Sequence, residues 1–208
     1  MKRVDFKRDL KKIYFPAPRD PELAKVPGMN FLMIDGKGSP TKSDAYQAAV
    51  DSLYAVSYAL KFSIKYSPQR IDYAILPVET LYWTEDMFAF SLDRRDDWLW
   101  TAMIRQPELI TREMVTEMMV DVREKKNPPA LDKMRFQSFK EGQCVQILHI
   151  GPYSAERLTI DKLHQFIKAN KYDFSGKHHE IYLNDPRNTS AESLKTVIRQ
   201  PIAPIKGK

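Results

Sequence analysis

What the sequence lacks excludes several classes of protein. Its single cysteine, Cys144, excludes an internal disulfide framework and a zinc site built from cysteines. No apolar run approaches the roughly 18 residues that a bilayer-spanning helix needs. The charges of residues 1–8 are not followed by the apolar stretch of a signal peptide. We therefore expect a cytoplasmic protein with no membrane partner, in which the lone cysteine is a small buried hydrophobic side chain.

Sequence motifs for cofactors and metals are also missing. The chain has no G-x-S-x-G elbow, no P-loop and no dinucleotide fingerprint. The run His178-His179-Glu180 invites a metal site, but adjacent residues on a strand point to opposite faces. Only His178 and Glu180 could then share one ion, and no other ligand cluster has recognisable spacing. The sequence predicts neither a metal nor a cofactor.

Charge is unevenly distributed along the 208 residues, whose net charge is +6. Residues 1–30 and residues 195–208 each carry +4, so residues 31–194 carry −2. A nucleic-acid-binding protein usually concentrates basic charge on a folded face. Basic termini that keep the protein soluble explain this pattern better. We therefore expect no direct binding of nucleic acid.

Turn residues and hydrophobic spacing predict alternating strands and helices. Four prolines within residues 1–30 indicate an N-terminal arm laid over the fold. Helices are predicted near residues 41–65, 111–126 and 154–170, with Thr41, Thr111 and Ser154 as their capping residues. Apolar and aromatic runs predict strands at residues 31–34, 73–76, 79–83, 87–90, 98–105, 143–150, 180–183 and 194–198.

An internal repeat organises these elements. Ile104-Arg105-Gln106-Pro107 recurs as Ile198-Arg199-Gln200-Pro201, and each copy closes a strand–helix–strand–strand order. We expect an α+β fold in which two tandem modules are related by pseudo-twofold symmetry around a central ligand pocket. Chance similarity of a tetrapeptide is the alternative. The predicted segments are an arm at residues 1–30, a first module at 31–107, a connecting helix at 108–135, a second module at 136–202 and a tail at 203–208.

Alternation along a strand decides which candidate side chains share a face. Trp98 and Trp100 share one and could form a flat apolar wall, although core packing explains two indoles equally well. Glu79 and Trp83 also share a face, which places a carboxylate beside an aromatic ring. Burial would raise the pKa of Glu79 toward the range useful for a general base. The alternative is an exposed glutamate on an edge strand.

The second half of the chain offers a similar pairing. Glu180 and Tyr182 lie on one face of a strand, where the charge and the ring could hold a cationic ligand. A pair on the protein surface is the alternative. His149 faces the same way as Gln143 on an earlier strand of this half.

Several segments taken together form a specific pattern. They are Pro77-Val78-Glu79-Thr80-Leu81-Tyr82-Trp83, Trp98-Leu99-Trp100-Thr101, Met103-Ile104-Arg105-Gln106-Pro107, Gln146-Ile147-Leu148-His149-Ile150-Gly151-Pro152-Tyr153 and His178-His179-Glu180-Ile181-Tyr182-Leu183-Asn184-Asp185-Pro186-Arg187. With these segments, the chain resembles the GyrI-like small-molecule-binding family over residues 20–202. The resemblance implies two tandem strand–helix–strand–strand modules around a central pocket, in agreement with the repeat. No helix-turn-helix precedes the domain, so the chain is similar to the stand-alone branch.

The resemblance also implies a pocket and a reaction. In the family's multidrug-responsive regulators, the pocket binds bulky aromatic, often cationic, compounds against a buried glutamate and aromatic rings. Some stand-alone members hydrolyse the cyclopropane of DNA-alkylating cyclopropanoid natural products. By that resemblance Glu79, Glu180, Trp83 and Tyr153 map to pocket positions. The sequence departs from the family at Tyr82, where a second tryptophan is expected before Trp83.

We therefore predict a protein that binds bulky planar hydrophobic or cationic xenobiotics and hydrolyses cyclopropanoid alkylating compounds, with Glu79 and Glu180 as catalytic carboxylates. The predicted ligand-binding residues are Trp83, Trp98, Trp100, His149, Tyr153 and Tyr182. Two alternatives stay open: a non-enzymatic drug-binding or sensing module, and a gyrase-inhibitor-like regulator that binds another protein. The predicted partner is a hydrophobic, aromatic small molecule, and a homodimer also stays open.

Overall fold

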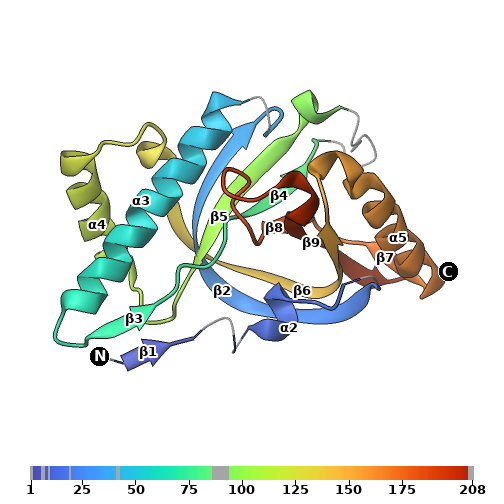
Figure 1. Cartoon of the computed structure of the whole chain (residues 1–208), viewed down its shortest axis with the longest axis horizontal. Helices are drawn as coiled ribbons and strands as arrows, with labels where there is room; N and C mark the ends of the chain where they lie inside the picture. The colour runs from blue at the N-terminus through green and yellow to red at the C-terminus, as the bar shows by residue number, and fades with distance from the viewer. Residues whose placement is uncertain are drawn as a thin grey trace.

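A long antiparallel sheet with helices packed against it forms the body of the molecule (Figure 1). The computed structural model describes residues 2–5, 8, 10–18, 20–40, 43–85 and 94–205. The strands are β1 (Lys2–Val4), β2 (Glu22–Lys37), β3 (Ile71–Tyr73), β4 (Glu79–Trp83), β5 (Leu99–Gln106), β6 (Arg135–Ile150), β7 (Tyr172–Phe174), β8 (His178–Tyr182) and β9 (Lys195–Pro204). The helices are α2 (Lys11–Tyr14), α3 (Asp44–Tyr66), α4 (Arg112–Lys125) and α5 (Glu156–Ala169), with short 3-10 turns η2 (Arg95–Asp97), η3 (Leu131–Lys133), η4 (Tyr153–Ala155) and η5 (Ala191–Ser193). The predicted mix of helices and strands is confirmed.

The sheet closes on itself through its longest strands. In the described residues its order is β6-β2-β5-β4-β8-β9-β7. The first part of β6 runs beside β2, with Arg135 opposite Met33, and its last part runs beside β9, with Ile150 opposite Lys195. The second pairing joins the ends of the order, so β6, β2, β5, β4, β8 and β9 form a closed ring (Figure 1). The ring gives each of these strands an inner face and an outer face.

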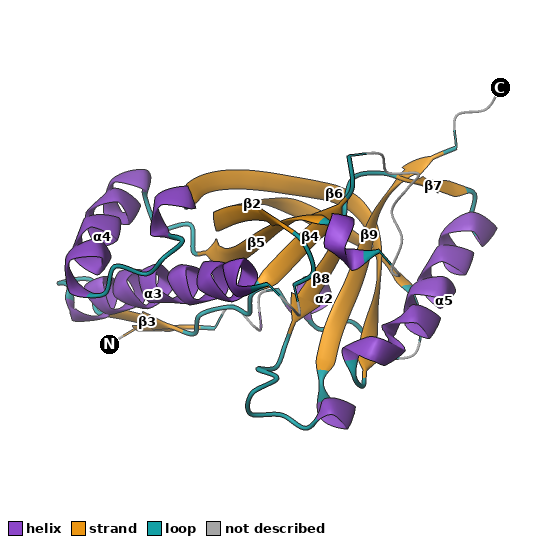
Figure 2. Ribbon diagram, turned by 90° about the horizontal axis from the view of Figure 1, so that it is seen from above, coloured by secondary structure: helices purple, strands orange, loops and turns teal. Residues whose placement is uncertain are grey.

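Helices α3 and α5 cover two separate parts of the outer face (Figure 2). Helix α3 buries Leu53 and Leu60 in one apolar core with Trp100 of β5. Helix α5 buries Leu163 in another core with Ile198 of β9. Strands β4 and β8 pair at the centre of the order, between the two helices (Figures 1 and 2). The outer-face side chains of β4 and β8 therefore lie between two apolar cores.

The inner face holds a further apolar core. Phe31, Met33, Leu81 and Met103 meet there from β2, β4 and β5. The fully buried Tyr14 of the short helix α2 packs in a neighbouring core with Ile181 of β8 and Val197 of β9. Because alternate residues of a strand point to opposite faces, β2, β4 and β5 each serve an inner and an outer core at once.

Local signals explain where two of the helices begin. The hydroxyl of Ser43 accepts a hydrogen bond from the third backbone N–H of α3. The hydroxyl of Thr111 accepts the corresponding hydrogen bond in α4, and this cap was predicted. Helix α5 begins after Ala155 without a side-chain cap, so the predicted cap Ser154 is wrong and instead lies in η4. The predicted cap Thr41 lies outside the described residues. None of the described helices is long and apolar enough to cross a membrane.

Several strands differ in extent from the sequence predictions. β2 begins at Glu22 instead of residue 31, so the boundary predicted at residue 30 falls inside a strand. Pro27 has no N–H to donate and is not paired in the ladder with β6. This proline explains why the sequence pattern did not predict a strand here. β9 runs on through Pro201, where the prediction ended it. The strand predicted at residues 73–76 ends at Tyr73, and that at residues 87–90 lies outside the described residues.

Gly36 lies where the buried Trp100 ring crosses β2. A Cβ atom at Gly36 would lie 2.1 Å from Cζ2 of that indole. We expect Gly36→Ala to lower the free energy of unfolding by about 1–3 kcal/mol, because the ring cannot move aside in a packed core. Gly28→Ala is the matched control on the same strand, since the nearest atoms to its new Cβ would be 3.8 Å away. Urea unfolding checks both variants, and equal stabilities would contradict the prediction.

Candidate functional site

A group of polar and aromatic side chains gathers on the outer face between α3 and α5. The register of β4 with β8 places Thr80 opposite Glu180 and Tyr82 opposite His178. Residues paired across two strands point to the same side, so these side chains share the outer face, and Tyr182 shares it two residues beyond Glu180. All but Tyr182 are buried. We use the name outer-face cluster for Glu180, His178, Tyr182, Tyr82 and Glu156.

Glu180 is held as a carboxylate in this cluster. His178 Nε2 lies 3.1 Å from its Oε1, and the Tyr182 hydroxyl donates to its Oε2 over 2.6 Å. The Tyr82 hydroxyl lies 2.6 Å from that of Tyr182 and so donates to it in turn. Burial raises the pKa of Glu180, but the interactions with His178 and Tyr182 outweigh burial and bring the pKa below its usual value. The cluster therefore contains a buried negative charge.

Glu156, the first residue of α5, is the second carboxyl of the cluster and is 2% exposed. Burial and the charge of Glu180 raise the pKa of Glu156 to about 9. The two environments thus shift the pKa values of the carboxyls in opposite directions, so that one carboxyl is ionised and the other neutral at pH 7. Our sequence reasoning missed Glu156. An acidic residue in the first turn of a helix suits the helix dipole and is usually exposed, so nothing in its spacing marks it as buried.

The two tryptophans are core residues, and one of them also borders the cluster. Trp98 and Trp100 are each 1% exposed. The Trp98 ring lies 4.9 Å from that of Tyr82, measured between centroids. Trp100 meets the edge of the Tyr46 ring from α3 at 5.1 Å. The alternative of core packing therefore fits both residues, and their role as an apolar wall of a ligand site stays a prediction.

Tyr153 approaches the cluster from η4, whereas His149 does not. The Tyr153 ring meets that of Tyr182 edge to face, with centroids 5.7 Å apart. Both rings are half-buried, while Glu180 is 5% exposed. His149 lies on the outer face, but its Nδ1 is 2.8 Å from the Thr159 hydroxyl and its Nε2 is 3.2 Å from the carbonyl of Pro152, just before η4. Both nitrogens of His149 thus hold the start of α5 in place.

Glu79 and Trp83 do not meet the outer-face cluster. Glu79 is paired with Ile181 instead of Glu180, so its side chain points to the inner face. Trp83 shares that face, and Lys177 Nζ lies 3.1 Å from the centroid of its ring. The two glutamates predicted as catalytic therefore lie on opposite faces of one sheet.

The inner face holds a network of its own, which consists of Glu79, His179, Glu141, Arg199 and Tyr14. His179 lies between two carboxylates, with Nε2 3.1 Å from Glu79 and Nδ1 2.9 Å from Glu141. Arg199 donates to Glu141 over 2.9 Å, and the Tyr14 hydroxyl donates to Glu79. Burial disfavours the charged forms, but mutual attraction outweighs it: the pKa of His179 is raised, and that of Glu141 is lowered to about 2. We name these five side chains the inner-face network.

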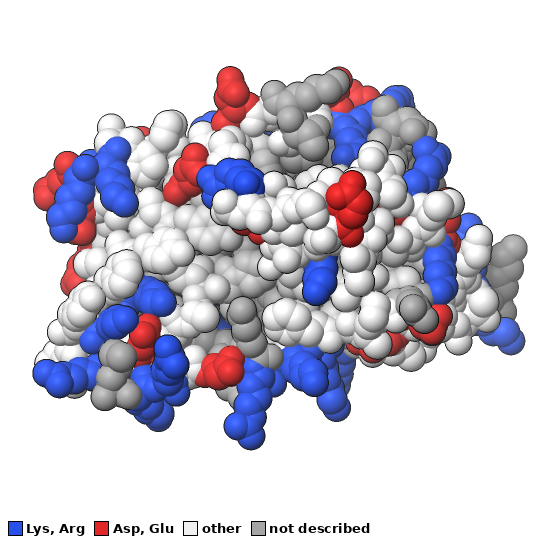
Figure 3. Space-filling model, in the orientation of Figure 1, with Lys and Arg blue, Asp and Glu red and all other residues white. Residues whose placement is uncertain are grey.

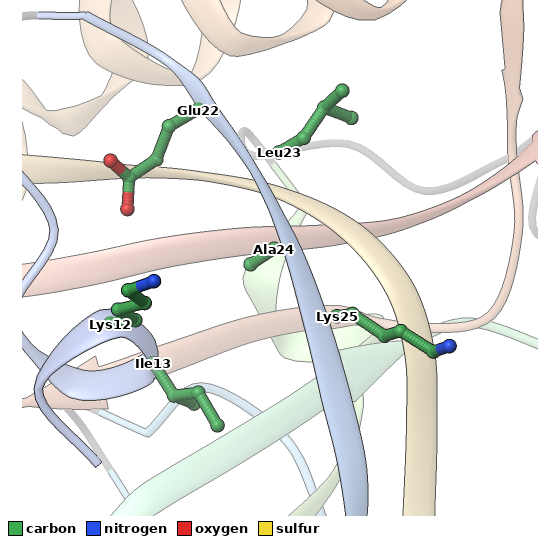
Figure 4. A pocket seen from close by; sticks show the side chains of 6 residues that line it. All are labelled: Lys12, Ile13, Glu22, Leu23, Ala24 and Lys25. Atoms are coloured by element: carbon green, nitrogen blue, oxygen red, sulfur yellow. The ribbon is translucent and has the colours of Figure 1, made fainter. Parts of the chain in front are cut away.

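The inner-face network also fastens α2 to the ring of strands. Arg199 Nη2 donates to the carbonyl of Ile13 over 2.6 Å, and Gln146 donates to that of Lys12 over 2.7 Å. A cavity of about 380 Å³ lies beside this contact, and its lining comes from α2 and the start of β2 (Figure 4). The lining residues are Lys12, Ile13, Glu22, Leu23, Ala24 and Lys25. None of them belongs to the outer-face cluster, and none is aromatic.

Charged side chains are unevenly distributed over the face of the molecule in Figure 3. Figure 3 shows Lys and Arg side chains along the lower edge, near β1, β3 and α2, and a mostly uncharged surface from α3 toward the middle of the molecule. Among the described residues, no group of three or more His, Cys, Asp or Glu side chains is arranged to hold a metal ion.

The family model of the GyrI-like small-molecule-binding domain matches residues 19–203. The chain belongs to this family. The match spans nearly the whole chain and confirms the resemblance seen in the motifs. The domain is therefore a GyrI-like small-molecule-binding domain.

Solved structures resemble this GyrI-like chain over nearly all of its length. An uncharacterized conserved protein from Listeria innocua is 41% identical, with a TM-score of 0.87, over 96% of this chain and 100% of that one. A hydrolase encoded by lin2189 from Listeria innocua is 40% identical, with a TM-score of 0.87, over 97% of this chain and 100% of that one. The EcmrR C-terminal domain, 13% identical over 89% of this chain and 98% of that one, has a TM-score of 0.56 and shares the fold. Among curated protein sequences, none matches this chain.

Proposed function

We propose that this GyrI-like domain binds bulky planar hydrophobic or cationic compounds between α3 and α5, and that it hydrolyses cyclopropanoid alkylating compounds there. The observation that carries the proposal is the buried Glu180 carboxylate, which His178 and Tyr182 hold among aromatic rings. Such a carboxylate suits a flat ligand that water must attack, because the rings bind the ligand and the carboxylate accepts a proton. The 40% identity to a Listeria innocua hydrolase supports the reaction.

The proposed reaction requires three tasks of the protein. A cyclopropane conjugated to a dienone is already electrophilic, so the protein binds the ring system, positions a water and accepts its proton. Each oxygen of the Glu180 carboxylate uses one lone pair toward His178 or Tyr182 and keeps another for a water. A general base of this kind contributes about 10²–10⁴-fold to the rate, and orientation of the water adds to it.

The other predicted residues take different parts in this proposal. Trp98, which packs on Tyr82, and Tyr153, which packs on Tyr182, are the proposed apolar walls. His149 holds the η4 turn that carries Tyr153. Glu79 and Trp83 support the sheet from its inner face and have no contact with the ligand. The catalytic carboxylate of the proposal is therefore Glu180 alone.

We further propose that the two halves are duplicated modules, β2-α3-β4-β5 and β6-α5-β8-β9, related by a pseudo-twofold axis. The element order is the same in both halves, and the repeated Ile-Arg-Gln-Pro lies at the end of β5 and within β9. Strands β4 and β8 hold the same position in the two orders and pair with each other. The contact between the Tyr82 and Tyr182 hydroxyls then lies at the junction of the modules, beside the proposed ligand site.

Mass spectrometry of a cyclopropanoid dienone incubated with the protein tests the proposal. We expect a product heavier by one water, formed faster than without protein, and quenching of tryptophan fluorescence on binding. Tight binding with no change of mass would contradict hydrolysis and favour a binding or sensing module. The absence of both binding and product would contradict the whole proposal.

A further inference from the structure

Glu156 and Glu180 reach the outer-face cluster from different elements. The register of β8 with β9 places Tyr182 opposite Thr196 and Glu180 opposite Ile198. Helix α5 packs on Ile198, and its first residue, Glu156, is buried at this end of the pair of strands. The groups close enough to interact electrostatically with Glu156 are Glu180 and Tyr182 of β8, Thr196 of β9, Tyr153 of η4 and Arg95 of η2.

The hydrogen bonds decide which carboxyl is ionised. Glu180 interacts with His178 through one oxygen and accepts a hydrogen bond from the Tyr182 hydroxyl at the other. Oε1 of Glu156 is buried and has no hydrogen-bond partner among the described residues. Two buried carboxyls that repel each other do not both ionise, so the proton stays on the one with fewer donors.

The influences that lower the pKa of Glu156 are weaker than those that raise it. The N-terminus of α5 and the guanidinium of Arg95 favour a negative charge there, as does the hydroxyl of Thr196. Burial and repulsion by Glu180 outweigh them and bring the pKa of Glu156 to about 9. At pH 7 the cluster therefore holds one carboxylate and one carboxylic acid, which is the arrangement that general acid–base catalysis requires.

We propose that Glu156 is the proton donor of this site: it keeps its carboxyl proton and gives it to the oxygen of the ligand while Glu180 takes the proton of the attacking water. This inference rests on the proposed function and adds the second catalytic residue to it. It also names the ligand chemistry, because a buried acid and a half-buried tyrosine suit a neutral carbonyl acceptor.

The proposed ring opening balances with these two groups. The water oxygen forms a bond to a cyclopropane carbon, and the C–C bond between that carbon and the dienone ring breaks. The electron pair of the broken bond moves into the dienone, which becomes a phenolate. Glu180 accepts a proton from the water, and Glu156 gives its own proton to the phenolate oxygen. The product is a phenol that bears an alcohol, and transfer of one proton from Glu180 to Glu156 restores the site.

The dependence of kcat/KM on pH tests this role with a cyclopropanoid dienone as substrate. Since Glu156 must be protonated, the wild-type rate is expected to fall above about pH 9. The pKa values of Tyr153 and Tyr182 are raised by burial well above their usual value, so neither tyrosine accounts for a fall at pH 9. Glu156→Gln keeps the size and neutrality of the side chain. It is expected to lower kcat by about 10²–10⁴-fold and to abolish the fall.

The matched control is Asp161→Asn, which changes an exposed carboxylate on the same helix and is expected to keep the wild-type profile. A Glu156→Gln variant with wild-type kcat and an unchanged fall above pH 9 would overturn the proposal. So would a fall that Asp161→Asn removes as well.

Infrared spectroscopy of the ligand-free protein separates this inference from the proposed function. The difference spectrum between wild type and Glu156→Gln at pH 7 is expected to contain the C=O stretch of a buried carboxylic acid, which disappears as the pH passes about 9. If that band is absent, Glu156 is not the proton donor, whatever the turnover. If the band is present and titrates as expected, the protonation state of Glu156 is supported. Absence of wild-type turnover would then count against the hydrolysis alone.

Discussion

Glu180→Gln is expected to lower kcat of the proposed hydrolysis by about 10²–10⁴-fold and to leave the fold intact. The amide occupies the same space, and its oxygen still accepts a hydrogen bond from either His178 or Tyr182. It cannot take the proton of an attacking water, which is the task assigned to the carboxylate. KM is expected to change little, because the proposed aromatic walls of the ligand site are untouched. Turnover measured by the gain of one water, with circular dichroism as the folding check, tests this.

The same experiment distinguishes the two glutamates that the sequence left equivalent. Glu79→Gln makes the matched change on the inner face, where it does not touch the outer-face cluster. Its folded fraction is expected to keep most of the turnover. Glu192→Gln, on the surface turn η5, is the control for handling. Loss of turnover in Glu79→Gln together with retained turnover in Glu180→Gln would reverse the assignment.

Glu180 and Glu79 lie on opposite faces of the sheet, and this is a part of the site that the sequence could not predict. Alternation within one strand correctly predicted that Glu180 and Tyr182 share a face, and they are in contact. It could not predict the register between β4 and β8, which places Thr80 opposite Glu180. A shift of one residue would have put both glutamates on one face. That register depends on packing across the whole sheet, and no local pattern encodes it.

The predicted arm shows a second limit of the sequence. Its prolines are typical of an irregular segment. The structure instead has β2 beginning at Glu22, and β2 is paired with β6 both before and after Pro27. The long β6 beside it supplies enough other hydrogen bonds to carry the strand past one residue without an N–H. The helix α2 was hidden for a different reason. Four residues are too few to show a helical period, and its anchors, Gln146 and Arg199, are far away in the sequence.

Arg199→Met is expected to lower the free energy of unfolding by about 3–5 kcal/mol. The guanidinium is fully buried and donates to Glu141, to Gln146 and to the carbonyl of Ile13. Methionine fills similar space but leaves the Glu141 carboxylate with His179 as its one remaining basic partner in the inner-face network, and α2 without one of its anchors. Urea unfolding measures the loss, and limited proteolysis near α2 is expected to become faster. Arg105→Met, at the equivalent position of the repeat, is the comparison.

The comparison is informative because the same tetrapeptide places the two arginines in different electrostatic settings. Arg105 pairs with Glu108, whose side chain is 73% exposed, so water solvates that carboxylate when the arginine is lost. The side chain of Glu141 is 2% exposed, and water cannot take the place of Arg199. Arg105→Met is therefore expected to cost less than Arg199→Met. The double variant Glu141→Gln with Arg199→Met removes both charges, and it should recover part of the stability that Arg199→Met alone loses. If the double variant is instead less stable than Arg199→Met, the stranded charge is not the cause, and the lost contacts to α2 account for the whole effect.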